Sequence, residues 1–158
     1  MGPTEVSAPV YEPPSAATAN FDPRDFAWSA APGTGSISGV LTYHRGTQRY
    51  SCQGSDVLLT PETPWSRRRM IILYGSATSA AAPVSIVRAR TPSAGAGDYA
   101  RFVRRTTCDE ASRFSFHGLP DGSWFVITLG KPLDGVGEPM ALTRRVETHG
   151  GDSPAPIS

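Results

Sequence analysis

The residues best suited by type and spacing to bind a ligand form the run from Trp65 to Arg69. Guanidinium groups bind carboxylates and phosphates through paired hydrogen bonds, and an indole ring beside them can stack on a bound group. Pro61 and Pro64 lie just before the run and favour a loop over a regular element. We therefore expect an inserted loop that binds a partner through Trp65, Arg67, Arg68 and Arg69. The alternative is a solvated basic loop tip with the Trp packed against a sheet.

The histidines and acidic residues show no pattern typical of an enzyme. His44, His117 and His149 are the only histidines, and none has a second ligand at metal-binding spacing. Asp109 and Glu110 lack the further acidic positions that a calcium loop needs. The sequence thus predicts no catalytic residue, no metal and no cofactor. The alternative is a small hydrolase or metal-dependent enzyme whose site is assembled from residues far apart in the chain.

Cys52 and Cys108, the only two cysteines, are candidates for a disulfide. Their spacing fits neither a CxxC redox motif nor a zinc site. A bond between them would close a loop of about 57 residues and stabilise the fold by about 4 kcal/mol in the chain-entropy model. It would also indicate an oxidising compartment. The alternative is two buried free thiols in a cytosolic protein.

The composition favours one turn-rich domain without general affinity for polyanions. The chain has 158 residues, of which 16 are Gly and 15 are Pro, a content that argues against a helical bundle. Fifteen basic and 14 acidic residues leave a formal charge of +1. We therefore expect no binding of nucleic acid and no electrostatic attraction to an anionic membrane.

Both ends of the chain are predicted to be disordered. Residues 1–20, rich in Pro, Ala, Ser and Thr, are typical of the flexible tether that follows the lipidated cysteine of a bacterial lipoprotein. Residues 150–158 are predicted to form a disordered tail. Neither a secretory signal nor an apolar run long enough for a membrane helix is present. We expect an exported protein, periplasmic or tethered to the outer membrane, whose only membrane contact is a lipid anchor on a removed N-terminal segment.

Alternating apolar and polar residues predict a β-domain between these ends. An irregular aromatic strap, 21–34, precedes a domain spanning 35–149, with an insertion at 61–82. The pattern shows no convincing amphipathic helix, so we predict an all-β antiparallel sandwich of about seven strands. Candidate strands lie at 36–43, 49–51, 54–61, 70–75, 83–88, 99–104, 114–116, 124–129 and 140–144.

The segment from Thr106 to Trp124 resembles the hallmark of carboxypeptidase regulatory-like domains, which are transthyretin-like (prealbumin-like) sandwiches. The matching features are a Thr and an Asp, the Phe-x-Phe strand at 114–116, the turn Gly118-Leu119-Pro120-Asp121-Gly122, and an aromatic residue after it. Gly39 and the segment 54–60 look like the first two strands of the family. Ser112 stands where the family usually has Gly. The resemblance implies a transthyretin-like (Ig-like) sandwich that serves as an accessory module.

These observations together predict a non-catalytic structural or binding module of the bacterial cell envelope. The expected setting is the soluble part of a lipoprotein. The expected partner is an envelope protein or a polysaccharide.

Overall fold

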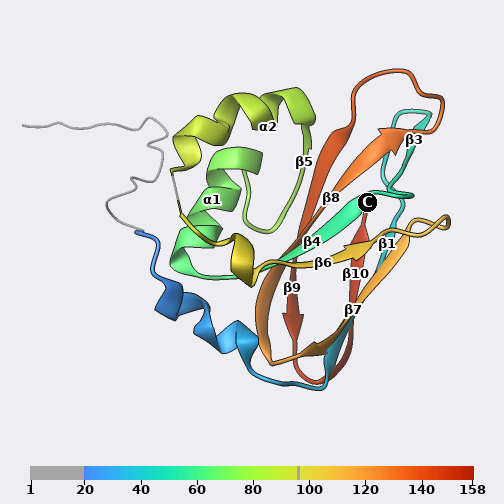
Figure 1. Ribbon diagram of the computed structural model, residues 1–158. Coiled ribbons are helices and arrows are strands. Elements are labelled where there is room, and N and C mark those ends of the chain that lie inside the picture. The colour runs from blue at the N-terminus through green and yellow to red at the C-terminus, as the bar shows by residue number, and fades with distance from the viewer. Residues whose placement is uncertain (1–19, 96) are drawn as a thin grey trace, which may run out of the picture.

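The smaller of two β-sheets places strands from the two ends of the folded chain side by side. The computed structural model describes residues 20–95 and 97–158. Among these, β10 (Gly151–Ile157), β1 (Gly35–Leu41) and β7 (Arg113–Leu119) form a three-stranded sheet in that order. Strand β1 pairs in parallel with β10 and antiparallel with β7, as Figure 1 shows. The last strand of the chain thus lies beside the first long one.

The larger sheet is centred on β8 (Gly122–Pro132), the longest strand of the described residues. It pairs with β3 (Gln48–Ser51), β4 (Asp56–Pro61) and β9 (Met140–Thr148). The sheet is completed by three shorter strands: β2 (His44–Arg45) beside β3, β6 (Arg104–Thr107) beside β4, and β5 (Ser79–Pro83) beside β9. All these pairings are antiparallel.

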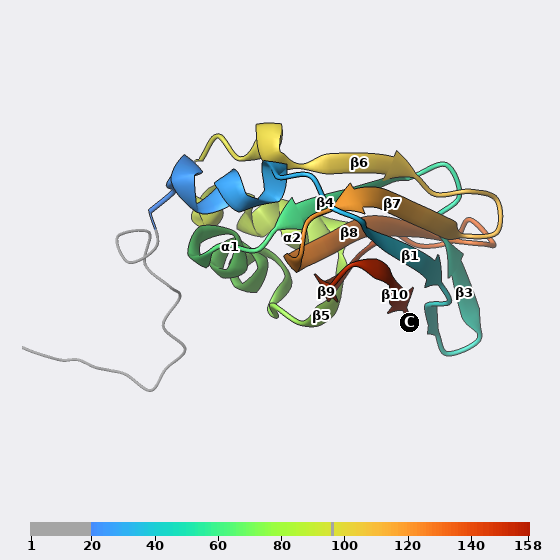
Figure 2. The same cartoon turned by 90° about the horizontal axis from the view of Figure 1, so that it is seen from below.

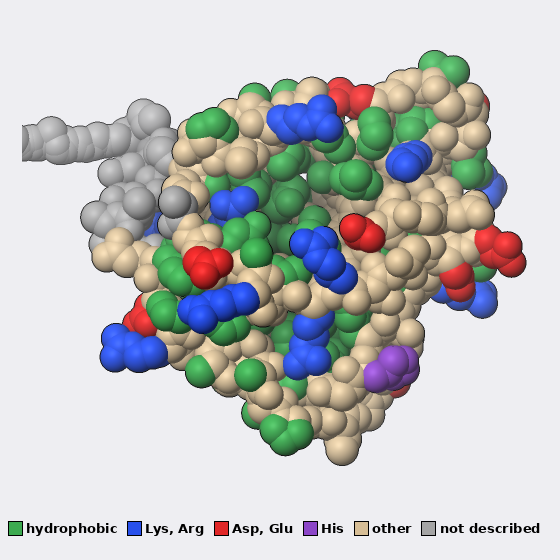
Figure 3. Space-filling model, in the orientation of Figure 1, with side chains coloured by type: hydrophobic (Ala, Val, Ile, Leu, Met, Phe, Trp, Pro, Cys, Tyr) green, Lys and Arg blue, Asp and Glu red, His purple; other side chains and the backbone are tan. Residues whose placement is uncertain are grey.

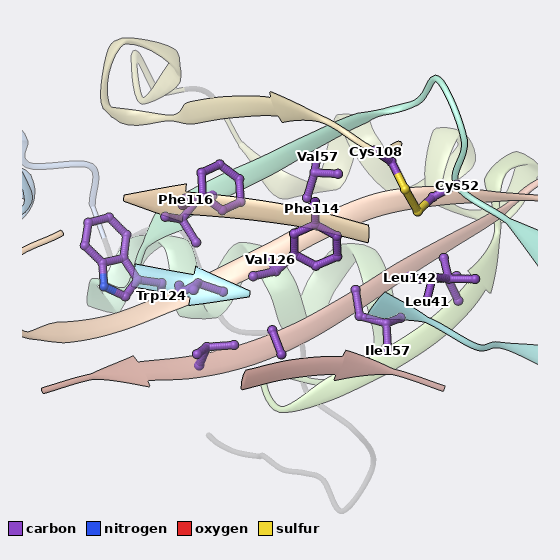
Figure 4. Packing of buried hydrophobic residues seen from close by; sticks show 14 of the residues in the cluster. Leu41, Cys52, Val57, Cys108, Phe114, Phe116, Trp124, Val126, Leu142 and Ile157 are labelled. Atoms are coloured by element: carbon purple, nitrogen blue, oxygen red, sulfur yellow. A yellow bond between two sulfur atoms is a disulfide. The ribbon is translucent and has the colours of Figure 1, made fainter. Parts of the chain in front are cut away.

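The main hydrophobic core lies between the two sheets. Alternate residues of each strand point inward, because successive side chains of a strand point to opposite faces. The smaller sheet contributes Ile37, Phe114, Phe116 and Ile157, and the larger sheet contributes Val57, Trp124, Val126 and Leu142, all buried in one cluster (Figure 4). The sheet-on-sheet core expected from the alternating pattern is therefore present.

Helices cover the other face of the larger sheet, so the prediction of an all-β fold is wrong. Among the described residues the structure has two α-helices and three 3-10 helices, and the fold is mixed α/β (Figure 2). They are η3 (Pro23–Ala30), α1 (Pro64–Tyr74), α2 (Val84–Arg90), η4 (Thr91–Ala94) and η5 (Ala100–Phe102). Met70 of α1 packs with Ala77 against Phe125 of β8, forming a second, smaller core.

Helix α1 replaces both the predicted inserted loop and the strand predicted at 70–75. Thr63 is its N-cap and accepts a hydrogen bond from the Ser66 amide, while the Ser66 hydroxyl accepts one from the Thr63 amide. Pro64 occupies the first turn, where its missing N–H costs nothing, and Gly75 ends the helix with a left-handed φ of 86°. These local signals outweigh the strand propensity of the apolar run 70–74.

The strand predicted at 83–88 is helix α2, and its start depends on a residue far along the chain. Glu138 accepts hydrogen bonds from the amide and the hydroxyl of Ser85, at 3.0 Å each. A carboxylate at this position satisfies an otherwise unpaired N–H of the first helical turn. The strand predicted at 99–104 is also displaced, because η5 occupies 100–102 and β6 begins at Arg104.

The C-terminal tail is a strand and not the disordered segment that its prolines suggested. Pro154 and Pro156 lie in β10, at the edge of the smaller sheet, where a residue without an N–H is tolerated. Ala155 and Ile157 alternate with them and are buried in the main core. The predicted tether, 1–20, lies outside the described residues except for Asn20. Within the described part of the chain, no helix is long and apolar enough to cross a membrane.

Candidate functional site

The β2–β3 hairpin and the end of β1 enclose a pocket of about 540 Å³. We call it the hairpin pocket. A cavity of this size falls in the range of small-molecule sites. Its lining includes two aromatic residues and several hydrogen-bonding side chains: Thr42, Tyr43, His44, Thr47, Arg49 and Tyr50.

The hairpin register places the side chains of His44 and Arg49 on one face of the hairpin. His44 and Arg49 are directly paired across β2 and β3, and paired residues of an antiparallel ladder point to the same side. Gly46 in the connecting turn has a φ of 61°, a conformation that glycine adopts without strain. His44 is exposed, and its Nδ1 lies 3.2 Å from the carbonyl oxygen of Gly46. The turn therefore presents an imidazole and a guanidinium side by side.

The aromatic floor of the hairpin pocket is held by the main core. The rings of Tyr43 and Tyr50 meet edge to face with centroids 5.0 Å apart. Tyr50 is buried, while Tyr43 is half-buried, and this burial raises the pKa of the Tyr43 hydroxyl. Tyr43 therefore stays neutral at physiological pH and offers a ring and a hydroxyl to the pocket.

A polar bridge holds the hairpin against the loop that follows β8. The Gln48 side-chain amide donates to Asp134 Oδ1 at 2.9 Å and to the carbonyl oxygen of Val136 at 2.8 Å. The amide of Leu133, which also lines the pocket, donates to the Arg49 carbonyl oxygen at 2.9 Å. Asp134 has a lowered pKa because the Val136 amide and Gln48 donate to it. The two walls of the pocket are thus fixed relative to each other.

The hairpin pocket combines a ring with neutral and cationic donors and has no acidic side chain in its lining. An arrangement of this kind can bind a polyhydroxylated ligand, whose C–H groups pack on the ring and whose hydroxyls accept from Arg49 and exchange hydrogen bonds with Thr42 and Thr47. These residues were not predicted from the sequence as a binding site. Their signal is the Arg45-Gly46-Thr47 turn, with Tyr43 two residues before it and Tyr50 three residues after it.

A site of the alternative, enzymatic kind would place His44 or His117 in a cleft with a carboxylate within hydrogen-bonding distance. His44 does line a pocket, but within the described residues no carboxylate hydrogen-bonds to either side chain. The ion pair involving a histidine in this part of the chain joins His149 Nε2 to Glu147 Oε1 at 3.5 Å on the surface. No group of three His, Cys, Asp or Glu residues is placed to hold a metal ion in the region that the structure describes.

The predicted partner-binding segment is placed away from the hairpin pocket, on α1. Trp65 is 6% exposed and packs edge-on against Phe21, with ring centroids 5.2 Å apart, and against Tyr99 at 5.0 Å. The Arg69 guanidinium lies 4.8 Å from the centre of the Tyr99 ring. The Trp65 ring and the Arg69 guanidinium therefore take part in packing.

The other two arginines of the segment have separate surroundings. Arg67 Nη1 lies 3.2 Å from Glu62 Oε2, and Arg68 is half-buried. Partner binding by this segment stays a prediction.

Cys52 and Cys108 form a disulfide, with Cα atoms 5.7 Å apart (Figure 4). The bond joins the turn before β4 to the turn before β7. Backbone hydrogen bonds from Gly54 N to the Cys108 carbonyl oxygen and from Cys108 N to the Ser55 carbonyl oxygen reinforce the same link. A disulfide is compatible with an extracytoplasmic location.

Comparisons with known proteins identify a similar fold and do not establish a function. No family model matches the chain, and no curated protein matches it significantly. The solved structures include a similar chain, that of a candidate carbohydrate-binding protein from Pseudomonas aeruginosa. The match has a TM-score of 0.63 and 22% sequence identity, and it covers 87% of this chain and 97% of the other. The two proteins therefore share a fold over nearly their whole lengths.

Proposed function

We propose that this protein is a non-catalytic binding module that recognises a saccharide unit in the hairpin pocket. The observation that carries the proposal is the position of Tyr43 beside His44 and Arg49 in a cavity with no acidic lining. A sugar ring has an apolar face that packs on an aromatic side chain and a rim of hydroxyls that need donors and acceptors. The pocket supplies both.

Two further observations agree with this proposal. The structurally similar Pseudomonas protein is described as a candidate carbohydrate-binding protein, which supports the same ligand class here. The Cys52–Cys108 disulfide supports a place outside the cytoplasm, where envelope polysaccharides are found. We accordingly propose an exported envelope protein whose partner is a polysaccharide. An envelope protein as the partner remains a prediction.

The kinship with carboxypeptidase regulatory-like domains is also a proposal. It is supported by the consecutive strands β7 and β8, which lie in different sheets and bury Phe114, Phe116 and Trp124 in the main core between them. Gly118, near the end of β7, has a φ of 68°, a conformation that glycine adopts without strain. Domains of that family act chiefly as accessory modules, in agreement with a binding role.

A panel of immobilised oligosaccharides tests the proposed function. We expect fluorescently labelled protein to bind at least one neutral oligosaccharide, and Arg49→Ala to weaken that binding about tenfold, since one or two hydrogen bonds are lost. Arg113→Ala removes another exposed arginine, on β7, and serves as the matched control. Failure to bind any saccharide, or equal weakening by both variants, would contradict the proposal.

A further inference from the structure

A second pocket, of about 430 Å³, lies between α2 and the face of the larger sheet that is turned away from the main core. We call it the α2 cleft. Figure 3 shows hydrophobic side chains in a hollow of this face, with basic and acidic side chains at its edge. The cleft shares no lining residue with the hairpin pocket, so it is a separate site.

The floor of the α2 cleft is an apolar surface that the helices cover only in part. Alternate residues of β8 point to this face. Phe125 is fully covered by α1, Ile127 is half-buried, and Leu129 is 37% exposed. Leu58 of β4 is paired with Ile127 and widens the same surface. Hydrophobic exposure therefore rises along β8 as α1 gives way to α2.

Helix α2 roofs the cleft without filling it. Val84 and Val87 line the cleft, yet α2 has no buried residue. The inner end is closed by Tyr74, whose pKa is raised to about 12 by burial. This hydroxyl stays neutral at physiological pH. The roof, the floor and the inner end together form an elongated apolar space.

The outer end of the cleft is cationic. Arg88, Arg105 and Lys131 line it against a single acidic residue, Asp56. Arg105 Nη1 lies 3.8 Å from Asp56 Oδ2, and the pair is exposed on both sides. The remaining two cations leave an excess of positive charge at the mouth, which favours an anionic group there.

A buried hydroxyl at the same end has no partner. Ser55 is 7% exposed and lines the cleft, and its Oγ makes no hydrogen bond within the described residues. A buried donor without a partner destabilises a fold unless a ligand or water accepts from it. Ser55 lies just before β4, whose Val57 is paired with Thr128 of β8, near Lys131. Ser55 and Lys131 therefore both belong to the lining of the apolar cleft.

We propose that the α2 cleft binds a medium-chain aliphatic carboxylate. The chain lies on Leu58, Ile127 and Leu129 under α2, and its carboxylate accepts from the Ser55 hydroxyl and pairs with Lys131. The charge of the mouth selects an anion, and the floor selects a hydrocarbon. This site is independent of the proposed saccharide site, and neither requires the other.

Calorimetry with decanoate below its micellar concentration tests this proposal on the whole protein. We expect saturable binding with one site per chain. Lys131→Gln should weaken decanoate binding at least fivefold while leaving 1-decanol binding unchanged, because only the carboxylate pairs with the ammonium group. Ser55→Ala should also weaken decanoate binding at least fivefold, because the carboxylate loses a hydrogen-bond donor. Arg113→Gln, a lost charge on a distant strand, should change neither.

The apolar half of the site is tested by a matched pair of substitutions. Leu129→Glu places a charge on the floor and should abolish decanoate binding. Ile86→Glu places the same charge on the outer side of α2, where Ile86 is 41% exposed, and should leave binding intact. Both side chains are partly exposed already, so we expect both variants to fold, with circular dichroism as the check.

Three results would overturn the proposal. One is the absence of saturable decanoate binding to the wild-type protein. Another is binding that Leu129→Glu leaves unchanged, or that Lys131→Gln weakens equally for decanoate and 1-decanol. The third is binding to phosphatidylglycerol vesicles alone, which would assign the basic rim to a membrane surface.

Discussion

Close contacts between individual residues determine which substitutions the main core tolerates. Gly39 of β1 is paired with Phe114 of β7, and a Cβ added at Gly39 would lie 2.0 Å from the end of the Phe114 ring. The ring therefore occupies the space that any side chain at position 39 would need. The glycine serves packing here and not a turn, since its φ is not in the left-handed region.

Gly39→Ala should lower the free energy of unfolding by about 2 kcal/mol, because the Phe114 ring has to leave a well-packed position. Urea denaturation measures the change. In a Phe114→Leu background the same substitution should cost less than half as much. An equal cost in both backgrounds would show that the Phe114 ring is not the obstacle.

Arg69→Ala should destabilise the fold by about 1 kcal/mol, because the guanidinium lies over the rings of Tyr99 and Trp65. Arg67→Ala, which removes a surface ion pair with Glu62, should cost less than about 0.5 kcal/mol. Thermal unfolding of the two variants decides between these roles. A melting temperature that both substitutions leave unchanged would contradict a packing role for Arg69 and support its predicted role in binding.

At the scale of elements, the sequence could predict those whose signals are local and not those that depend on contacts with distant residues. The strands at 36–43, 54–61 and 114–116 could be predicted because apolar residues alternate along them. Those at 124–129 and 140–144 are largely buried on both faces and could be predicted as short, mainly apolar runs. Helix α1 was missed although Thr63, Pro64 and Gly75 mark its ends. Helix α2 and strand β10 could not be read locally, because Glu138 completes one and pairing with β1 completes the other.

A carboxylate fastens β10 to β1. Asp152 Oδ1 accepts from the hydroxyls of Ser36 and Ser38, at 2.8 and 2.7 Å. These bonds, the Ser38 one first, lower the pKa of Asp152 below its usual 3.8, and the charge of His117 adds to the effect. The stabilising contribution is therefore complete above pH 3.8 and is lost as the pH falls through the lowered pKa.

Asp152→Ala should lower the melting temperature at pH 7 by about 1–2 °C, and the difference from wild type should disappear once the pH is low enough to protonate Asp152 in the folded protein. Differential scanning calorimetry between pH 2 and 7 measures both effects. Glu110→Ala, at an exposed carboxylate in the loop before β7, is the control. A difference that persists undiminished at pH 2 would contradict this role.

At the scale of the whole molecule, the disulfide and the two cores unite segments from the entire described chain. Cys52 and Cys108 were a candidate disulfide because they are the only two cysteines and fit neither a redox nor a zinc motif, and the structure confirms the bond. The candidate site was less predictable. His44 and Arg49 are brought side by side only by the hairpin register. Trp65 was expected to be accessible to a partner because the residues that bury it, Phe21 and Tyr99, are distant in sequence.

The double variant Cys52→Ala/Cys108→Ala should lose about 4 kcal/mol of unfolding free energy, because the open chain gains the entropy that the crosslink removes. Urea unfolding of this variant and of the wild-type protein in reductant should agree. A loss below about 1 kcal/mol in both would mean that the backbone hydrogen bonds around the disulfide hold the two turns together without it.

The central claim is that the hairpin pocket binds a saccharide, and amide chemical shifts measured during titration with an oligosaccharide test it most directly. We predict shifts confined to Thr42–Tyr50 and the neighbouring Leu133, saturating with one dissociation constant. In His44→Ala these shifts should saturate at several-fold higher saccharide concentration. Shifts that map to another surface, or that are unchanged by His44→Ala and Arg49→Ala alike, would contradict the claim.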